Sequence, residues 1–302
     1  MGRDLADAFP VARHTFEEVD DALSQRLSAL MFEGPAEELG LTENTQPALM
    51  AVSLAVYRVL IDLGMKPLPE VAALAAGHSL GEYSALATVG AFGLADTARL
   101  LKRRGQAMQR AVPVGTGAMA AILGANLDDA VAIAEAARAA PDGKTEVCQT
   151  ANDNAPGQVV ISGHAAAVER AIAIAAERGF RKAIKLAVSA PFHCSLMQPA
   201  ADEMAEALAA ATIAPTAIPV VSNITAAPTT TPSEIRRLLV EQVTGMVRWR
   251  ESVLAMKAAG VDKIVELGSG KVLAGLVKRI DPEIAGSSVG TPADIETFLK
   301  TV

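Results

Sequence analysis

The sequence predicts an α/β fold, in which a large domain built on a parallel sheet carries an inserted ferredoxin-like subdomain. Apolar segments with strand character alternate with amphipathic helical segments over much of the 302 residues, as in parallel sheets covered by helices. Between residues 117 and 188 the order changes to β-α-β-β-α-β, which is the ferredoxin-like signature. We therefore expect residues 1–116 and 189–302 to form the large domain and residues 117–188 to form the subdomain.

In the first part of the chain the apolar spacing predicts two helices, at residues 3–23 and 47–63, and the second is apolar enough to be buried. A strand at 71–76 follows, then a serine-containing turn, then an amphipathic helix at 96–112. The order of strand, turn and helix is typical of a parallel sheet in which a side chain is presented at the end of a strand.

The remaining segments support the insertion. In the subdomain we expect strands at 118–123, 146–152, 158–162 and 181–188, and helices at 127–139 and 165–178. Beyond it we expect strands at 218–222 and 263–267, and helices at 233–243, 250–259 and 272–280. Because the alternation of strand and helix resumes after residue 188, the subdomain interrupts a single larger domain.

Composition restricts the class of protein. The chain is 51% hydrophobic but only 3% aromatic, and it contains no apolar run of about 18 residues that would indicate a membrane span. The cysteines, Cys148 and Cys194, fit neither a disulfide framework nor a metal site, which favours a reducing cytosol. The net charge of −7 disfavours nucleic-acid binding. We expect a cytoplasmic monomer with no membrane or nucleic-acid partner and no metal or cofactor.

Residues Gly77-His78-Ser79-Leu80-Gly81, followed by Glu82, form a G-x-S-x-G pattern between the predicted strand and a helix. This arrangement holds a serine hydroxyl clear of the sheet at a helix N-terminus, as in α/β-hydrolase-like folds. We expect both glycines to be needed because a side chain on either flank would crowd the serine. The pattern predicts that Ser79 is a nucleophile, and the alternative is a tight turn with a capping serine.

A serine nucleophile needs a base within hydrogen-bonding reach. Of the four histidines, His14 lies in a charged helix, His164 precedes a helix as a turn or cap residue, and His78 is expected to point away from Ser79. His193 lies in a proline-containing loop where the subdomain returns the chain to the large domain, which predicts the general base. A buried structural histidine is the alternative. No Asp or Glu is placed as the third member of a triad, so that position stays open.

Arg104 lies on the predicted helix 96–112, on the side of Leu100, Leu101 and Met108. A buried guanidinium needs an anionic partner, and a substrate carboxylate would serve. The alternative is that the basic residues of this helix form a solvated face.

With these residues in place, the chain resembles the malonyl-CoA:acyl carrier protein transacylases, the acyltransferases that load extender units in fatty acid synthesis. The resemblance covers nearly the whole chain. Its motifs are at residues 45–49, 77–83, 104–109, 115–119, 154–158, 192–193 and 268–273.

The resemblance implies a ping-pong reaction in which malonyl-CoA is a substrate, a malonyl-serine ester forms, and acyl carrier protein accepts the malonyl group. It implies these roles: Ser79 as nucleophile, His193 as base, Arg104 on the malonyl carboxylate, Leu80 N–H at the oxyanion, the backbone carbonyl of Gln242 orienting His193, and Gln46 near the acyl group. Phe192, before the histidine, would disfavour an α-methyl branch. The pathway, fatty acid or polyketide, and the exact extender unit stay open.

The family normally opens with a strand and a Gly-Gln-Gly-Ser-Gln loop whose first glutamine supplies a second oxyanion donor, whereas this sequence begins Met1-Gly2-Arg3. We expect the natural start to lie upstream, and a chain made as written to be unstable or nearly inactive, because losing one such donor costs about 10²–10³ in turnover. Two other readings are a serine hydrolase (thioesterase or esterase), which would need a triad acid, and an inactive remnant that only binds CoA or carrier protein.

Overall fold

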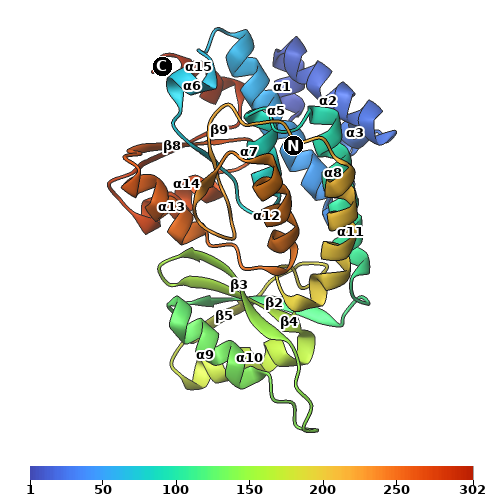
Figure 1. Ribbon diagram of the computed structural model, residues 1–302, viewed down its shortest axis with the longest axis vertical. Helices are drawn as coiled ribbons and strands as arrows, with labels where there is room; N and C mark the ends of the chain where they lie inside the picture. The colour runs from blue at the N-terminus through green and yellow to red at the C-terminus, as the bar shows by residue number, and fades with distance from the viewer. Residues whose placement is uncertain (302) are drawn as a thin grey trace.

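The computed structural model describes residues 1–301, and it is a mixed α/β structure (Figure 1). The N-terminal region is helical: α1 (Arg3–Ala8), α2 (Pro10–Leu23), α3 (Leu27–Glu33), α4 (Ala36–Leu39) and α5 (Thr42–Asp62). The helix expected at 3–23 is divided, because Phe9 adopts an extended conformation between α1 and α2. Helix α5 begins five residues earlier than expected and is buried along most of its length.

The nucleophile strand is shorter than expected. Residues 68–71 form a helical turn, α6 (Leu68–Val71), that starts after Pro67, and only β1 (Ala75–Ala76) pairs as a strand. It runs parallel to β6 (Val220–Val221), which pairs antiparallel with β7 (Pro228–Thr229). A separate parallel pair is formed by β8 (Lys263–Leu267) and β9 (Ala285–Val289). Within residues 1–301, the expected parallel sheet is therefore present as two short pieces, one with an antiparallel edge strand.

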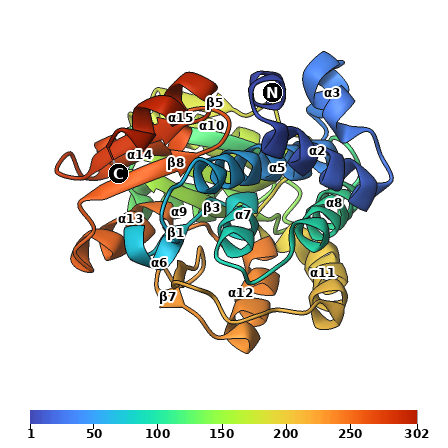
Figure 2. The same ribbon diagram turned by 90° about the horizontal axis from the view of Figure 1, so that it is seen from above.

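The remaining helices outside residues 117–188 cover these short sheets; most of them contribute to the main apolar core, and the two within residues 249–280 pack around a second, smaller one. They are α7 (Leu80–Thr88), α8 (Leu94–Arg110), the 3₁₀ turn η1 (Ser195–Met197), α11 (Gln198–Ala210), α12 (Pro232–Thr244), α13 (Trp249–Ala258), α14 (Val272–Ile280) and α15 (Pro292–Leu299). Seen from above, α5 lies in the middle of the molecule, and it contacts α2, α7 and α8 as well as β8 (Figure 2). Among the described residues, no helix is both long enough and apolar enough to cross a bilayer.

Residues 117–188 contain the third sheet, which we call the β2–β5 unit. Its strands are β2 (Gly117–Leu123), β3 (Cys148–Ala155), β4 (Gln158–His164) and β5 (Lys182–Lys185), and its helices are α9 (Leu127–Ala137) and α10 (Ala165–Glu177). The strands are antiparallel in the order β3-β4-β2-β5, so the first and third of the unit are central, as in a ferredoxin-like sheet. Its helices pack on one face around an alanine-rich core that also contains isoleucine and valine.

The β2–β5 unit is joined to the rest of the molecule through β3. The backbone of Val247, just before α13, exchanges hydrogen bonds with Ala151 and Asp153, each 2.9 Å long. Arg250 of α13 then places Nη2 2.8 Å from a carboxylate oxygen of Asp153, whose side chain is only 1% exposed. This backbone bridge and ion pair fix β3 against the loop between α12 and α13 and against the start of α13.

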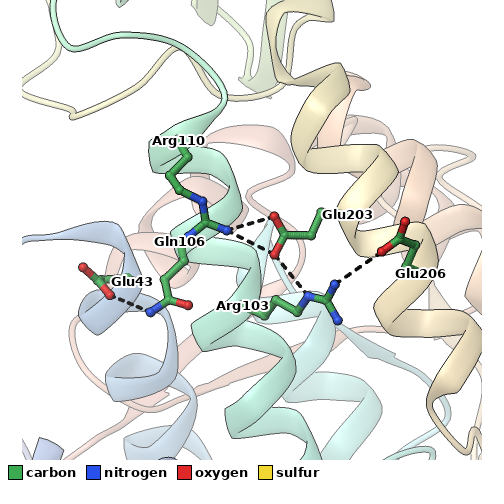
Figure 3. A network of polar contacts seen from close by, with 6 residues as sticks. All are labelled: Glu43, Arg103, Gln106, Arg110, Glu203 and Glu206. Carbon is green, nitrogen blue, oxygen red and sulfur yellow. Dashed lines mark hydrogen bonds and ion pairs between the residues drawn. The ribbon is translucent and has the colours of Figure 1, made fainter.

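Helix α8 is held in place by a network of charged side chains (Figure 3). Arg103 and Arg110 both donate to Glu203 of α11, at 3.1 and 2.9 Å, and Gln106 donates to Glu43 of α5 at 3.1 Å. Although partial burial opposes it, hydrogen bonds from the two arginines hold the pKa of Glu203 below its ordinary value. The network fixes α8 between α5 and α11, and α8 carries Arg104 on its buried side.

Replacing Arg250 with methionine should strongly destabilise the protein, because the Asp153 carboxylate would be left buried without a partner. We expect the free energy of unfolding to fall by about 2–4 kcal/mol, toward the low end of the range for breaking a buried pair because Arg250 is partly exposed. Urea unfolding at pH 7 measures it. Arg237→Met, which removes an exposed pair with Glu241, is the control and should cost less than about 1 kcal/mol. Equal effects in the two variants would contradict this account of the β3 junction.

Candidate active site

Ser79 lies on a strained turn between β1 and α7. Its φ of 54° and ψ of −112° are unusual for a residue with a side chain. Gly77 makes the turn possible, because a Cβ there would lie 1.9 Å from the carbonyl oxygen of Gly81. The expectation that Gly81 is needed for the same reason is wrong: a Cβ at Gly81 would meet nothing within 4 Å. The two glycines therefore differ, and only Gly77 is required by close contact.

The serine hydroxyl faces His193. Ser79 Oγ lies 2.8 Å from His193 Nε2, and His193 Nδ1 lies 2.9 Å from the backbone oxygen of Gln242. Because a carbonyl oxygen can only accept, Nδ1 carries the proton and the lone pair of Nε2 is directed at the hydroxyl. This is the geometry of a nucleophile and its base. The acceptor at Nδ1 is a carbonyl, not the carboxylate of a serine-protease triad.

Burial, and then the positive charge of Arg104, lower the pKa of His193 to about 3. The imidazole is therefore neutral at physiological pH and able to accept a proton. Two other histidines, His78 and His164, have different surroundings. His78 Nε2 lies 2.8 Å from Asn154 Oδ1, and its ring packs on Trp249. His164 Nδ1 accepts from the backbone N–H of Val147 at 2.9 Å.

Arg104 projects from α8 into the same site and is 1% exposed. Its Nη1 donates to Gln46 Oε1 at 2.7 Å, and its Nη2 donates to Gln242 Oε1 at 2.8 Å and to Ser79 Oγ at 3.2 Å. These acceptors are neutral. Within residues 1–301 no carboxylate forms an ion pair with Arg104, and its Nε has no hydrogen-bond partner. A solvated face is thus the wrong reading for Arg104, although Lys102 of the same helix does pair with Glu43 near the surface.

Two residues of the site were missed by sequence reasoning. Asn223 accepts from the backbone N–H of Ser79 and donates to the backbone oxygen of Gly77, both at 2.7 Å, so it clamps the turn. Glu82 accepts from Gln242 Nε2 at 2.6 Å. Signals existed for both: Asn223 directly follows the predicted strand 218–222, at the carboxyl end where sites form, and Glu82 directly follows the G-x-S-x-G pattern.

The remaining predicted residues lie around this centre. Leu80 is the first residue of α7, and its backbone N–H has no acceptor among the described residues, so it is free to bind an oxyanion. Gln46 lies behind Arg104 and also donates to Thr42 Oγ1 at 2.9 Å. The structure therefore brings together a nucleophile, a neutral base, a free N–H donor and a buried cation. That set can move an acyl group that carries a negative charge.

Comparison with known proteins agrees with this chemistry. Residues 1–284 match the family described as acyl transferase domain. The chain belongs to this acyltransferase family.

Its relatives narrow the class. It is 47% identical over 300 residues to the malonyl CoA-acyl carrier protein transacylase of Escherichia coli K12, covering 99% of this chain and 94% of that protein. The crystal structure of the acyl-carrier-protein-S-malonyltransferase of Bartonella henselae superposes with a TM-score of 0.95 at 51% identity, over 100% and 94% of the two chains. A malonyl-transacylase solved in complex with its type II PKS acyl-carrier protein superposes with a TM-score of 0.94 at 41% identity, over 100% and 95%. The resemblance to malonyl transacylases that the motifs indicated is confirmed.

Because its pKa is about 3, His193 should not titrate between pH 5 and 8. NMR of the histidine ring protons, assigned by comparison with His193→Gln, measures this. Arg104→Met should raise the pKa of His193, because the second cause of the depression is removed while burial persists. A wild-type midpoint near the ordinary value of 6.5 would show that the imidazole is more exposed than this geometry allows.

Proposed function

We propose that this protein transfers a malonyl group from malonyl-CoA to the phosphopantetheine thiol of acyl carrier protein. The observation that carries the proposal is the buried guanidinium of Arg104, which lies 3.2 Å from Ser79 Oγ and has no carboxylate partner in residues 1–301. An acyl group bearing a carboxylate would supply the missing anion at the reacting serine. The names of the relatives, including one solved with its carrier protein, support the same donor and acceptor.

In the first half-reaction Ser79 Oγ attacks the thioester carbonyl while His193 Nε2 accepts the hydroxyl proton. The developing oxyanion is stabilised by the N–H of Leu80. The C–S bond then breaks, His193 returns its proton to the departing CoA thiolate, and a malonyl-serine ester remains. In the second half-reaction His193 takes the proton of the phosphopantetheine thiol, the sulfur attacks the ester, and Ser79 recovers its hydroxyl.

Gln242 and Gln46 have supporting roles in this proposal. The backbone oxygen of Gln242 holds the Nδ1–H tautomer of His193. When Nε2 accepts a proton during the reaction, the imidazolium that forms is short-lived, because it is buried and lies near the positive charge of Arg104. The side chains of Gln46 and Gln242 hold two arms of the guanidinium. The serine hydrolase reading gains no support here, since the group at His193 Nδ1 is not a carboxylate and Arg104 would have no role with neutral esters.

The proposal includes the organisation of the chain. Residues 1–116 and 189–302 form an α/β-hydrolase-like catalytic domain, and residues 117–188 form a ferredoxin-like subdomain that closes one side of the site. One chain supplies every side chain of the mechanism, which is consistent with a monomer. The free, buried cysteines fit an enzyme of the reducing cytoplasm.

Arg104→Met should remove the preference for malonyl over acetyl groups. We expect kcat/KM for malonyl-CoA to fall about 100-fold or more, because each charge-assisted hydrogen bond contributes about 1.5–3 kcal/mol. The rate with acetyl-CoA should stay constant or rise. Transfer to holo acyl carrier protein from each donor measures both.

Arg99→Met, on the exposed side of the same helix, is the matched control and should leave the malonyl-to-acetyl ratio unchanged. Because the readout is a ratio within one protein, a low absolute rate does not affect it. A ratio that Arg104→Met leaves at the wild-type value would refute the assignment of Arg104 to the carboxylate.

A further inference from the structure

Glu82 is a buried carboxylate beside the reacting serine that the proposed mechanism does not use. It lies in the first turn of α7, three residues after Ser79, and is 3% exposed. Its Oε2 accepts from Gln242 Nε2 at 2.6 Å and from the backbone N–H of Asn223 at 3.3 Å. Within residues 1–301 it forms no ion pair closer than 4 Å with Arg104 or any other cation. Glu82 therefore contacts the site through the side chain of Gln242 and through the backbone of Asn223, and of these two only Gln242 also contacts Arg104 and His193.

The carboxamide of Gln242 lies between two opposite charges. Its oxygen accepts from Arg104 Nη2 at 2.8 Å, and its nitrogen donates to Glu82 at 2.6 Å and to the backbone oxygen of Ser79 at 3.0 Å. If the carboxamide were reversed, its NH₂ would face the N–H donors of Arg104 and its oxygen would face the carboxylate of Glu82. Both contacts would be repulsive, so the pair of charges selects one orientation.

That orientation affects both reacting groups. The same Nη2 that donates to Gln242 also donates to Ser79 Oγ, and the backbone oxygen of Gln242 accepts from His193 Nδ1. Displacement of Gln242 would therefore shift the guanidinium and the imidazole together. A misplacement of about 1 Å in such a group can cost about 100-fold in rate.

We propose that Glu82 is a positioning residue, whose carboxylate locks Gln242 and thereby holds Arg104 and His193 in the arrangement that acylates Ser79. The identity of the acyl donor in this inference rests on the proposed function, whereas the contacts of Glu82 do not depend on it.

The energetics of Glu82 agree with a role in function over one in stability. Burial raises its pKa to about 7, opposed by the hydrogen bonds from Gln242 and Asn223 and by the charge of Arg104. The pKa of this carboxyl in the unfolded chain is about 4.5, so the folded protein binds the proton more tightly than the unfolded chain does. The free energy of unfolding therefore decreases as the pH rises from 4.5 through 7. The ionised carboxylate is thus present at a cost to stability. The charged or titratable groups beside it are Arg104 from α8 and Tyr83 from α7, whose phenol burial keeps protonated.

The test is Glu82→Gln, with Glu241→Gln as the control, because Glu241 is the exposed neighbour of Gln242. We expect Glu82→Gln to lower kcat for malonyl transfer about 10- to 100-fold at pH 8, with KM for malonyl-CoA changed less than threefold. Wild-type kcat should rise with pH through about 7, and that rise should be absent in Glu82→Gln. The melting temperature at pH 8 should be equal to or above that of wild type.

Two further measurements separate this proposal from the proposed function. The rate at which a neutral fluorophosphonate labels Ser79 depends on the serine and its base but not on malonyl-CoA, and it should also fall about tenfold in Glu82→Gln. In a Gln242→Met background, which keeps the backbone oxygen, Glu82→Gln should cause no additional loss, because the path through the carboxamide is already cut.

The outcomes are decisive in each direction. Slower labelling and transfer, retained stability and non-additivity with Gln242→Met support the positioning role. A labelling rate in Glu82→Gln equal to that of the wild type would overturn it. A melting temperature of Glu82→Gln below that of the wild type at pH 8 would also overturn it, because Glu82 would then be a structural residue. Labelling that falls as expected in a protein without malonyl transfer would keep the positioning role and reject the proposed function.

Discussion

The site depends on one buried cation. The guanidinium of Arg104 is buried, and within residues 1–301 it has no carboxylate partner. It donates instead to the amide oxygens of Gln46 and Gln242 and to the hydroxyl of Ser79, which take the place of water as its hydrogen-bond acceptors. Burying a charge is costly unless hydrogen bonds and counter-charge compensate. The neutral acceptors offset this cost only in part. The favourable interaction with a counter-charge is therefore still available to an acyl group that carries a carboxylate. Burial, and then this same charge, lower the pKa of His193 and so keep the base neutral.

The fold maintains this arrangement at the expense of local strain. Both reacting residues, Ser79 and His193, have positive φ angles, of 54° and 57°, which residues with side chains rarely adopt. Asn223 clamps the backbone at Gly77 and at the N–H of Ser79, and the Arg103–Glu203–Arg110 network fixes the helix that carries the cation. Rigid surroundings let these contacts persist without the substrate, so little reorganisation is needed when it binds.

Local patterns in the sequence predicted the parts of the site that depend on local structure. The glycine-flanked serine predicted the turn, the helical register predicted the burial of Arg104, and the order of segments in 117–188 predicted the ferredoxin-like strand order. The contacts that complete the site could not be predicted in this way, because they join residues far apart: Gln242 reaches the backbone of Ser79 across 163 positions and Asn223 across 144. The predicted strand 71–76 is longer than the observed one. Its alanine-rich run has no clear period, and a helical turn begins after Pro67 in its place. Strand β9 is not predicted because Gly286, Ser287 and Ser288 form its centre and Val289 is its one β-branched residue, which gives a weak strand signal.

The central claim is that Ser79 is acylated by a group whose carboxylate binds Arg104. The most direct measurement is the intact mass of the protein after incubation with malonyl-CoA or acetyl-CoA, with the Ser79→Ala variant as the control. Because one acyl group adds to each serine, a slowly reacting enzyme also accumulates the full mass shift. The account predicts a malonyl adduct on the wild type, little acetyl adduct, and neither on Ser79→Ala. Equal malonyl and acetyl adducts, or a malonyl adduct that persists in Ser79→Ala, would contradict it.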